Sequence, residues 1–318
     1  MRELAVALVA IALAVPVQAQ SRFKTRWGDP DLQGLWSNAT LTPLERTKEM
    51  ADKPTLTAEE AAEIDRTGLE RTLKPVAPEV RLSGELNEIW LELGQVVRTR
   101  RSSLIVDPPD GKLPFTPEGK KRRDQALARA INLVPINSWE DRSLAERCLM
   151  TGGLLAPNPF YLNNHQIFQT RDHVVIASEV FHEYRIIPLD RRPSLGPLIQ
   201  LWSGESRGRW EGETLVVETA NFNGKGGFQG SGAGLKLVER FTRVDADAID
   251  YELTTSDPAS FTQPWTLQNT LRTIKGPIFE YACHEGNYGM VTILNGARAQ
   301  ERARAQEELK KAQDSQKQ

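Results

Sequence analysis

The C-terminal half of the chain alternates between apolar and polar residues with the period of two that a half-buried strand requires. Ile249, Tyr251 and Leu253 fall on one face of such a strand, and Asp250 and Glu252 fall on the other. The same pattern predicts strands at residues 173–179, 184–190, 214–222, 235–245, 248–256, 265–274 and 278–283. Short polar turns join them, so we expect an antiparallel meander.

The N-terminal half has a different, mainly helical pattern. The expected elements are strands at 32–37 and 102–106 and helices at 42–71, 85–97 and 116–133. Thr57 and Glu60 have the spacing of a capping box, and Thr116-Pro117 has the N-cap and N1 pattern of a helix start. No alternation of strands and helices is present that would favour a doubly wound sheet.

These patterns predict a mainly β fold with a helical N-terminal segment. The expected architecture is an antiparallel up-and-down β-barrel or a strongly bent sheet, in one domain over residues 20–296. A helical and loop segment at about 42–135 would wrap it. Residues 297–318 are mostly Ala, Gln, Glu, Arg and Lys, which is typical of either a solvated helix or a disordered tail.

The first 19 residues have the pattern of a cleaved signal peptide. Arg2 precedes an apolar run at 4–15, and small residues lead to a cleavage site after Ala19. This run is shorter than the roughly 20 apolar residues of a transmembrane helix, and no later window approaches that length. A buried N-terminal helix is the alternative. We expect a periplasmic or extracellular protein without an integral membrane segment after cleavage.

Charge and cysteine content narrow the picture further. A net charge of −2 argues against a general nucleic-acid binder, which would carry a basic stripe. The two cysteines are Cys148 and Cys283. In an oxidising compartment they are expected to form a disulfide, and two buried free thiols are the alternative.

Four strings are distinctive: residues 30–38 (PDLQGLWSN), 102–111 (SSLIVDPPDG), 206–217 (SRGRWEGETLVV) and 281–290 (YACHEGNYGM). Together they resemble a large group of exported proteins of soil bacteria to which no activity is assigned. The resemblance implies export and a bacterial origin, and it implies no catalytic residue. Gly34-Leu35-Trp36 is also similar to the opening of lipocalin-like barrels, although about 130 mainly helical and loop residues separate it here from the strand-rich region.

Known catalytic motifs are absent from the sequence. It contains no His-Glu-x-x-His zinc motif, P-loop, nucleophile elbow or Rossmann fingerprint, and it indicates neither a metal nor a cofactor. Residues 224–234 are glycine-rich, but strands are expected on both sides of them. Since a phosphate cradle needs a following helix, we expect a lid or a loop at the barrel mouth.

Histidine and carboxylate residues give one catalytic hypothesis. Adjacent strand residues point to opposite faces, so His182 and His284 would have to meet from different strands. Glu285, or a carboxylate such as Glu179 or Glu213, would complete a general acid–base site near neutral pH. The alternative is that these are ordinary hydrogen-bonded histidines.

Other residues suggest a ligand site. Arg185 and Arg192 could hold a carboxylate or a sugar acid, or could belong to surface ion pairs. Asn287 and Tyr288 follow a predicted strand, where loops carry function. The tryptophans that could stack on a sugar or an aromatic ligand, or cap the core, are Trp202, Trp210 and Trp265.

Two functions therefore follow from the sequence. The first is an exported barrel that binds a small organic molecule or glycan in its cavity. The alternative is a hydrolase or lyase that acts on a carbohydrate or phenolic compound, with His284 and His182 as acid and base.

Overall fold

The computed structural model describes residues 23–72, 92, 94–130, 136–150, 163–190 and 192–315. The predicted signal peptide lies outside these residues and remains a prediction. The helices in the described part are α1 (Ala58–Thr72), α2 (Pro117–Ala130) and α3 (Tyr288–Ser315). None of the helices in that part is both long enough and apolar enough to cross a bilayer.

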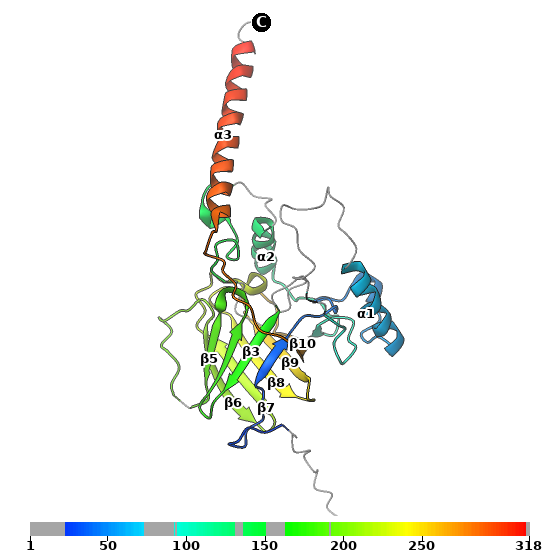
Figure 1. The fold of residues 1–318 in the computed structure, drawn as a ribbon. Helices are drawn as coiled ribbons and strands as arrows, with labels where there is room; N and C mark the ends of the chain where they lie inside the picture. The colour runs from blue at the N-terminus through cyan, green and yellow to red at the C-terminus, as the bar shows by residue number, and fades with distance from the viewer. Residues whose placement is uncertain are drawn as a thin grey trace, which may run out of the picture.

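The strands form an antiparallel sheet that curls into a nearly closed barrel (Figure 1). Their bounds are β1 Gly34–Ser37, β2 Ile105–Asp107, β3 Asn164–Gln169, β4 His173–Ser178, β5 Tyr184–Pro188, β6 Glu205–Glu211, β7 Thr214–Ala220, β8 Lys236–Arg243, β9 Ala248–Ser256 and β10 Trp265–Thr273. The order around the barrel is β5-β4-β3-β1-β10-β9-β8-β7-β6, and β2 pairs with β10 beside this path. The predicted antiparallel β-barrel is confirmed.

Most of the predicted strands form, but one does not. Residues 278–283 were expected to be a strand and have no regular secondary structure. The reason is that β10, which precedes them, already pairs with β9 on one side and β1 on the other. The ends of the sheet path, β5 and β6, face each other. Residues 278–283 therefore leave the barrel.

Two of the helices predicted in the N-terminal segment correspond to α1 and α2. The capping box is confirmed, since the Thr57 backbone N–H donates to Glu60 and the Glu60 N–H donates to the Thr57 hydroxyl. However, the helix begins only at Ala58 and not at residue 42. The predicted helix at 116–133 corresponds to α2, of which residues 131–133 lie outside the described residues.

The predicted helix at 85–97 is wrong at its C-terminal end. Residues 94–97 are not helical; Gln95 forms a parallel bridge with Thr40. Gly94 lies so close to this segment that a Cβ there would be 2.3 Å from the Thr40 nitrogen. Close approach of two backbones overrides the helical periodicity here. Most of residues 85–93 lie outside the described part.

The last helix, α3, extends away from the barrel (Figure 1). None of its described side chains is buried. Ion pairs along its surface include Arg298–Glu301 and Glu307–Lys311. Of the two alternatives given for the tail, the described residues form the solvated helix, which begins before residue 297, at Tyr288.

Alternate residues of each strand point into the barrel and form its core. On β8 and β9 these are Leu237, Glu239, Phe241, Ile249, Tyr251 and Leu253. Each of the six is no more than 1% exposed. A charged residue therefore sits among apolar ones in the interior.

The buried carboxylate of Glu239 pairs with Arg185, whose side chain is also inside the barrel. One Arg185 amino group donates to Glu239 Oε1 at 3.0 Å, and the other contacts Glu239 Oε2. The second group also donates to Ser206 at 3.3 Å and reaches Thr219 at 3.5 Å. Tyr251 donates its hydroxyl to Glu239 at 2.9 Å. A single guanidinium on β5 thus contacts side chains of β6, β7 and β8.

This contact matters because β5 and β6 lie together without a backbone ladder between them. Gly208 on β6 allows their close approach: a Cβ there would lie 2.8 Å from both Ile187 and Leu189. Side-chain packing and the Arg185 network therefore close the barrel. We call the β5–β6 junction the seam.

His165 on β3 belongs to the same buried polar layer. Its ring nitrogens contact the Ser178 hydroxyl at 3.0 Å and the Asn38 side-chain oxygen at 3.3 Å. Burial, reinforced by the positive charge of Arg185, lowers the pKa of His165 to about 3. The imidazole is therefore neutral in the folded protein at neutral pH.

The buried histidine predicts a specific pH dependence of stability. Between about pH 6.5 and about pH 3 the unfolded chain binds a proton at His165 that the folded chain does not. The free energy of unfolding should therefore fall as pH drops through this window, by up to about 1.4 kcal/mol per pH unit from this group. Above about pH 6.5 His165 is neutral in both the folded and the unfolded chain, so the stability is no longer reduced by this group.

Urea unfolding of the wild type and His165→Gln from about pH 7.5 to about pH 4 measures this contribution as the difference between the two slopes. We expect the variant to have the shallower slope. Equal slopes would show that His165 is not held neutral by burial.

Candidate functional site

The predicted catalytic histidines lie on two neighbouring segments. His182 ends a 3-10 helix, Val180–His182, between β4 and β5, and its side chain is exposed. Its Nε2 accepts a 3.2 Å hydrogen bond from the Tyr281 backbone N–H. His284 is also exposed. The two segments are thus neighbours, but the contact uses the backbone of residue 281 and not the imidazole of His284.

Of the two proposed carboxylates, Glu179 directly precedes the 3-10 helix that ends at His182, whereas Glu213 is far from it. Glu179 is buried, and its carboxylate accepts a 3.0 Å hydrogen bond from Asn164. Glu213 lies in the β6–β7 turn and pairs with Lys24 at 2.6 Å. The strand directions place this turn at the opposite end of the barrel from His182. A His182–Glu213 arrangement is therefore not formed.

The two predicted ligand arginines are also separated. Arg185 is inside the barrel, where Glu239 occupies its guanidinium. Arg192 follows β5 on the surface and pairs with Asp190. They do not form a joint carboxylate clamp at a barrel mouth.

The aromatic and glycine-rich candidates mostly close the barrel. Trp265 is fully buried and stacks on Phe228, 5.9 Å between ring centroids, from the glycine-rich loop. Asp257 anchors that loop by accepting the Gly232 N–H at 2.8 Å. Trp210 packs against the core, and only Trp202 is substantially exposed. The predicted mouth loop is thus held in place by hydrogen bonds and aromatic packing.

The C-terminal segment carries the other candidate residues, and a disulfide fixes it. The predicted Cys148–Cys283 bond is present, with sequence separation 135. Asn287 reinforces it by donating to the Glu146 carbonyl and the Cys148 sulfur, both at 3.2 Å. The Tyr281 ring meets Phe181 edge-on at 5.1 Å. Residues 281–287 are therefore held against both the 145–148 region and the β4–β5 turn.

These two chain segments enclose a cleft of about 840 Å³. The residues that line it are Ala145, Glu146, Cys148, Glu280, Tyr281, Ala282, Cys283, Glu285, Gly286, Asn287, Gly289, Met290 and Ile293. We call it the disulfide cleft. Of the predicted site residues, Glu285, Asn287 and both cysteines line it, whereas His182, His284 and Tyr288 do not. Tyr288 is 77% exposed at the start of α3.

All described charged residues that line the disulfide cleft are acidic. Its charged lining residues are Glu146, Glu280 and Glu285, and no Lys, Arg or His is among its described lining residues. Glu146 already accepts hydrogen bonds from Ser143 and pairs with Arg142. Glu280 and Glu285 have exposed side chains at the cleft. The lining therefore combines carboxylates with apolar surface.

Sequence reasoning missed most of this lining, nine of its thirteen residues. Glu146 and Ala145 could have been found, because a predicted disulfide brings the neighbours of Cys148 to the segment around Cys283. Met290 and Ile293 had no such signal, since the helix was expected to begin after them. In the described residues, no group of three or more His, Cys, Asp or Glu side chains is placed to hold a metal ion.

Comparisons with known proteins give no relative. No protein-family model matches the chain, and no curated protein matches it.

Removal of the disulfide should loosen the C-terminal segment and leave the barrel protected from hydrogen exchange. In a Cys148→Ser/Cys283→Ser variant we expect amide hydrogens of residues 275–287 to exchange faster, because the covalent link to the 145–148 region is lost and noncovalent contacts, such as those made by His182, Asn287 and Phe181, have to hold the segment. Amides of β9 and β10 should stay protected. Hydrogen exchange with mass spectrometry measures both, and loss of protection throughout the barrel would contradict this assignment.

Proposed function

We propose that this is an exported protein that binds a small organic cation in the disulfide cleft. The observation that carries the proposal is the single sign of charge in that cleft, where three carboxylates meet apolar surface. A ligand with an ammonium group and a hydrocarbon or aromatic body would match both features.

The size of the cleft supports a small-molecule ligand. Small-molecule sites are typically about 300–1,000 Å³, lined by apolar surface with a few polar groups that set orientation. The cleft volume of about 840 Å³ falls within this range. Met290, Ile293 and the disulfide would contact the body of the ligand.

The electrostatics supports a positive charge on that ligand. Glu280 and Glu285 would attract a cation and exclude an anion, because repulsion between like charges would not be offset by any described basic lining residue. Tyr281 also lines the cleft, and an aromatic ring is a surface that attracts an ammonium group.

The barrel interior is a weaker candidate for the ligand. Side chains occupy its inward positions, and Arg185 and Glu239, at 7% and 0% exposure, are paired with each other there. A ligand in the interior would have to displace this pair. We therefore place the predicted small-ligand site outside the barrel.

Export is supported by two independent features. The first 19 residues have the signal-peptide pattern. The Cys148–Cys283 disulfide suits an oxidising compartment such as the periplasm or the extracellular space. The hydrolase or lyase alternative stays a prediction, and no specific contact among the described residues favours it.

The proposal predicts a charge-dependent affinity. Titration calorimetry with choline, phenethylamine and spermidine, and with uncharged and anionic compounds of similar size, would identify the ligand class. For the best cation, Glu280→Gln and Glu285→Gln should each weaken binding about two- to fivefold, since the attraction of an exposed carboxylate is worth roughly 0.5–1 kcal/mol. Glu308→Gln, an exposed glutamate of α3 outside the cleft lining, serves as the control.

Two outcomes would contradict the proposal. One is that none of the cations binds, or that an anionic compound binds more tightly. The other is that the cleft variants and Glu308→Gln have the same affinity as the wild type, which would place the site elsewhere.

A further inference from the structure

A second surface feature is independent of the disulfide cleft. The connection between β5 and β6 contains a run, residues 193–202, which we call the apolar loop. Its exposed side chains, with their exposed fractions, are Leu195 40%, Leu198 96%, Ile199 48%, Leu201 40% and Trp202 39%. Large apolar residues at such exposure and such density are typical of a surface that another phase or molecule covers.

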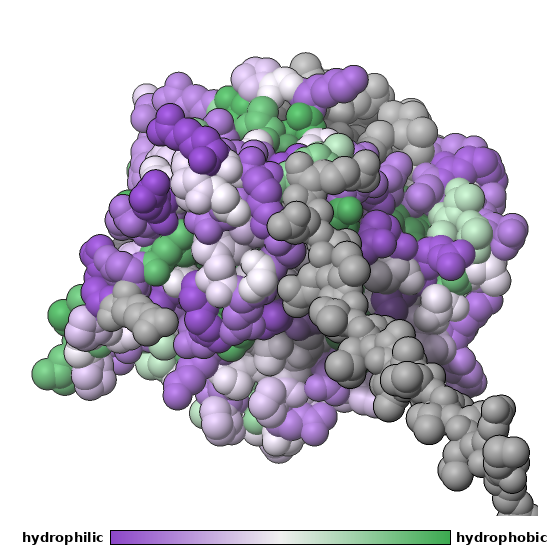
Figure 2. Space-filling view, turned by 90° about the horizontal axis from the view of Figure 1, so that it is seen from below, coloured by the Kyte–Doolittle hydropathy of each residue, from purple (hydrophilic) through white to green (hydrophobic). Residues whose placement is uncertain are grey.

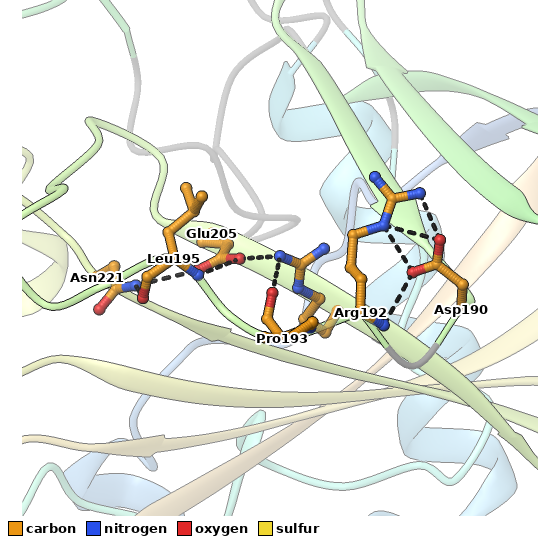
Figure 3. Close-up of polar contacts among 7 residues, drawn as sticks. Asp190, Arg192, Pro193, Leu195, Glu205 and Asn221 are labelled. Carbon is orange, nitrogen blue, oxygen red and sulfur yellow. Dashed lines mark hydrogen bonds and ion pairs between the residues drawn. The ribbon is translucent and has the colours of Figure 1, made fainter.

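Polar contacts hold the base of the apolar loop (Figure 3). The Leu195 N–H donates to the two carboxylate oxygens of Glu205, at 3.0 and 2.9 Å. Asn221 donates to the Leu195 carbonyl at 3.2 Å and to Glu205 at 2.9 Å. Arg207 donates to the Pro193 carbonyl at 3.0 Å. The loop is thus attached at its start to β6 and to the residue after β7.

The other end is attached to the same place. The Leu201 N–H donates to the Asn221 carbonyl at 2.8 Å, and the Leu201 carbonyl accepts from the Asn223 N–H at 2.8 Å. Between these attachments, the Ile199 N–H donates to the Gly196 carbonyl at 2.9 Å. With the loop attached in this way, Leu198 is left exposed between the two ends.

The apolar loop projects from the side of the barrel. In Figure 1 the β5–β6 connection extends to the left of the strands, and Figure 2 shows hydrophobic side chains on a lobe at the same edge of the molecule. The surface is therefore convex at its apolar apex, which suits insertion into a soft phase better than a fit against a flat partner.

Apolar side chains continue from the loop onto the outer wall of the barrel. Ser203 donates to Glu183, the residue before Tyr184, which is 63% exposed. Farther along the outer wall, Phe168 faces Val175 and Val175 faces Ile186 in the strand register. Phe168 and Ile186 are 45% and 62% exposed.

Two ion pairs lie at the base of the apolar loop. Asp190 pairs with Arg192, and Glu205 pairs with Arg207. No excess of either sign is left among these four residues to select a charged partner. These two ion pairs at the base of the loop leave apolar contact as the main source of attraction that the described residues of the loop offer.

We propose that the apolar loop inserts into the interface of a phospholipid bilayer and attaches the protein to a membrane surface. Leu198 and Ile199 enter the acyl region, and Trp202 lies at the level of the headgroups, where its amphipathic ring is favoured. A protein partner is less well matched, because the apex is aliphatic and convex, whereas protein hot spots are enriched in Tyr, Trp and Arg.

The test is co-flotation of the full mature protein with vesicles of pure phosphatidylcholine, which carry no net charge. The wild type should float with the vesicles, and Leu198→Asp/Ile199→Asp should reduce the bound fraction at least about tenfold. Leu309→Asp on α3, a leucine that is 62% exposed, is the matched control and should bind as the wild type does. Melting temperatures verify that each variant is folded.

Two further measurements make the result specific. Brominated acyl chains should quench part of the tryptophan fluorescence, and Trp202→Phe should remove that part. Binding should also survive high salt, because no net charge contributes. Three outcomes would overturn the proposal: no flotation of the wild type, flotation unaffected by the loop variant, or flotation only with anionic vesicles at low salt. Self-association that the loop variant abolishes, without vesicle binding, would identify a protein interface instead.

Discussion

The ion pair between Arg185 and Glu239 is the contact on which the barrel depends. Taking two charges out of water costs several kcal/mol, and only good geometry with additional hydrogen bonds offsets that cost. Here Ser206, Thr219 and Tyr251 supply those bonds. Burial disfavours the charged guanidinium, but Glu239 outweighs it and keeps the pKa of Arg185 above its ordinary value. Because β5 and β6 share no backbone ladder, the hydrogen bond from Arg185 to Ser206 on β6 and the ion pair with Glu239 on β8 are side-chain links between β5 and the other end of the sheet among the described residues.

The same pair is the reason for proposing functional surfaces outside the barrel. Because side chains fill the interior, the ligand and membrane sites that we propose are both on segments at the periphery of the barrel. At one place a disulfide holds the C-terminal segment against residues 145–148 and encloses an acidic cleft. At another, side chains of β6 and the residues after β7 hold the two ends of the apolar loop. In both cases most of the residues concerned have no helix or strand of their own.

The sequence predicts those strands whose inner face is apolar, such as β9, and it misses β3 and β6. Their inward residues include His165, Ser206 and Gly208, and polar or absent side chains inside a barrel erase the alternation that identifies a strand. Arg185 was misplaced for the same reason, since burial of its partner Glu239 depends on strands far apart in the sequence. The disulfide was predictable from cysteine count and compartment. The cleft was only partly predictable. Met290 and Ile293 line it because of the way the C-terminal segment packs in the folded protein, which the sequence pattern does not indicate.

The most direct test of the account is hydrogen exchange at the seam in an Arg185→Met/Glu239→Gln variant, which removes the pair without leaving a lone buried charge. We expect amides of β5 and β6 to exchange at least about tenfold faster than in the wild type, while those of β9 and β10 change less. The exposed Arg209–Glu218 pair, changed to Arg209→Met/Glu218→Gln, should have little effect. Unchanged protection of β5 and β6, or an equal loss in every strand, would show that the Arg185–Glu239 pair does not close the barrel.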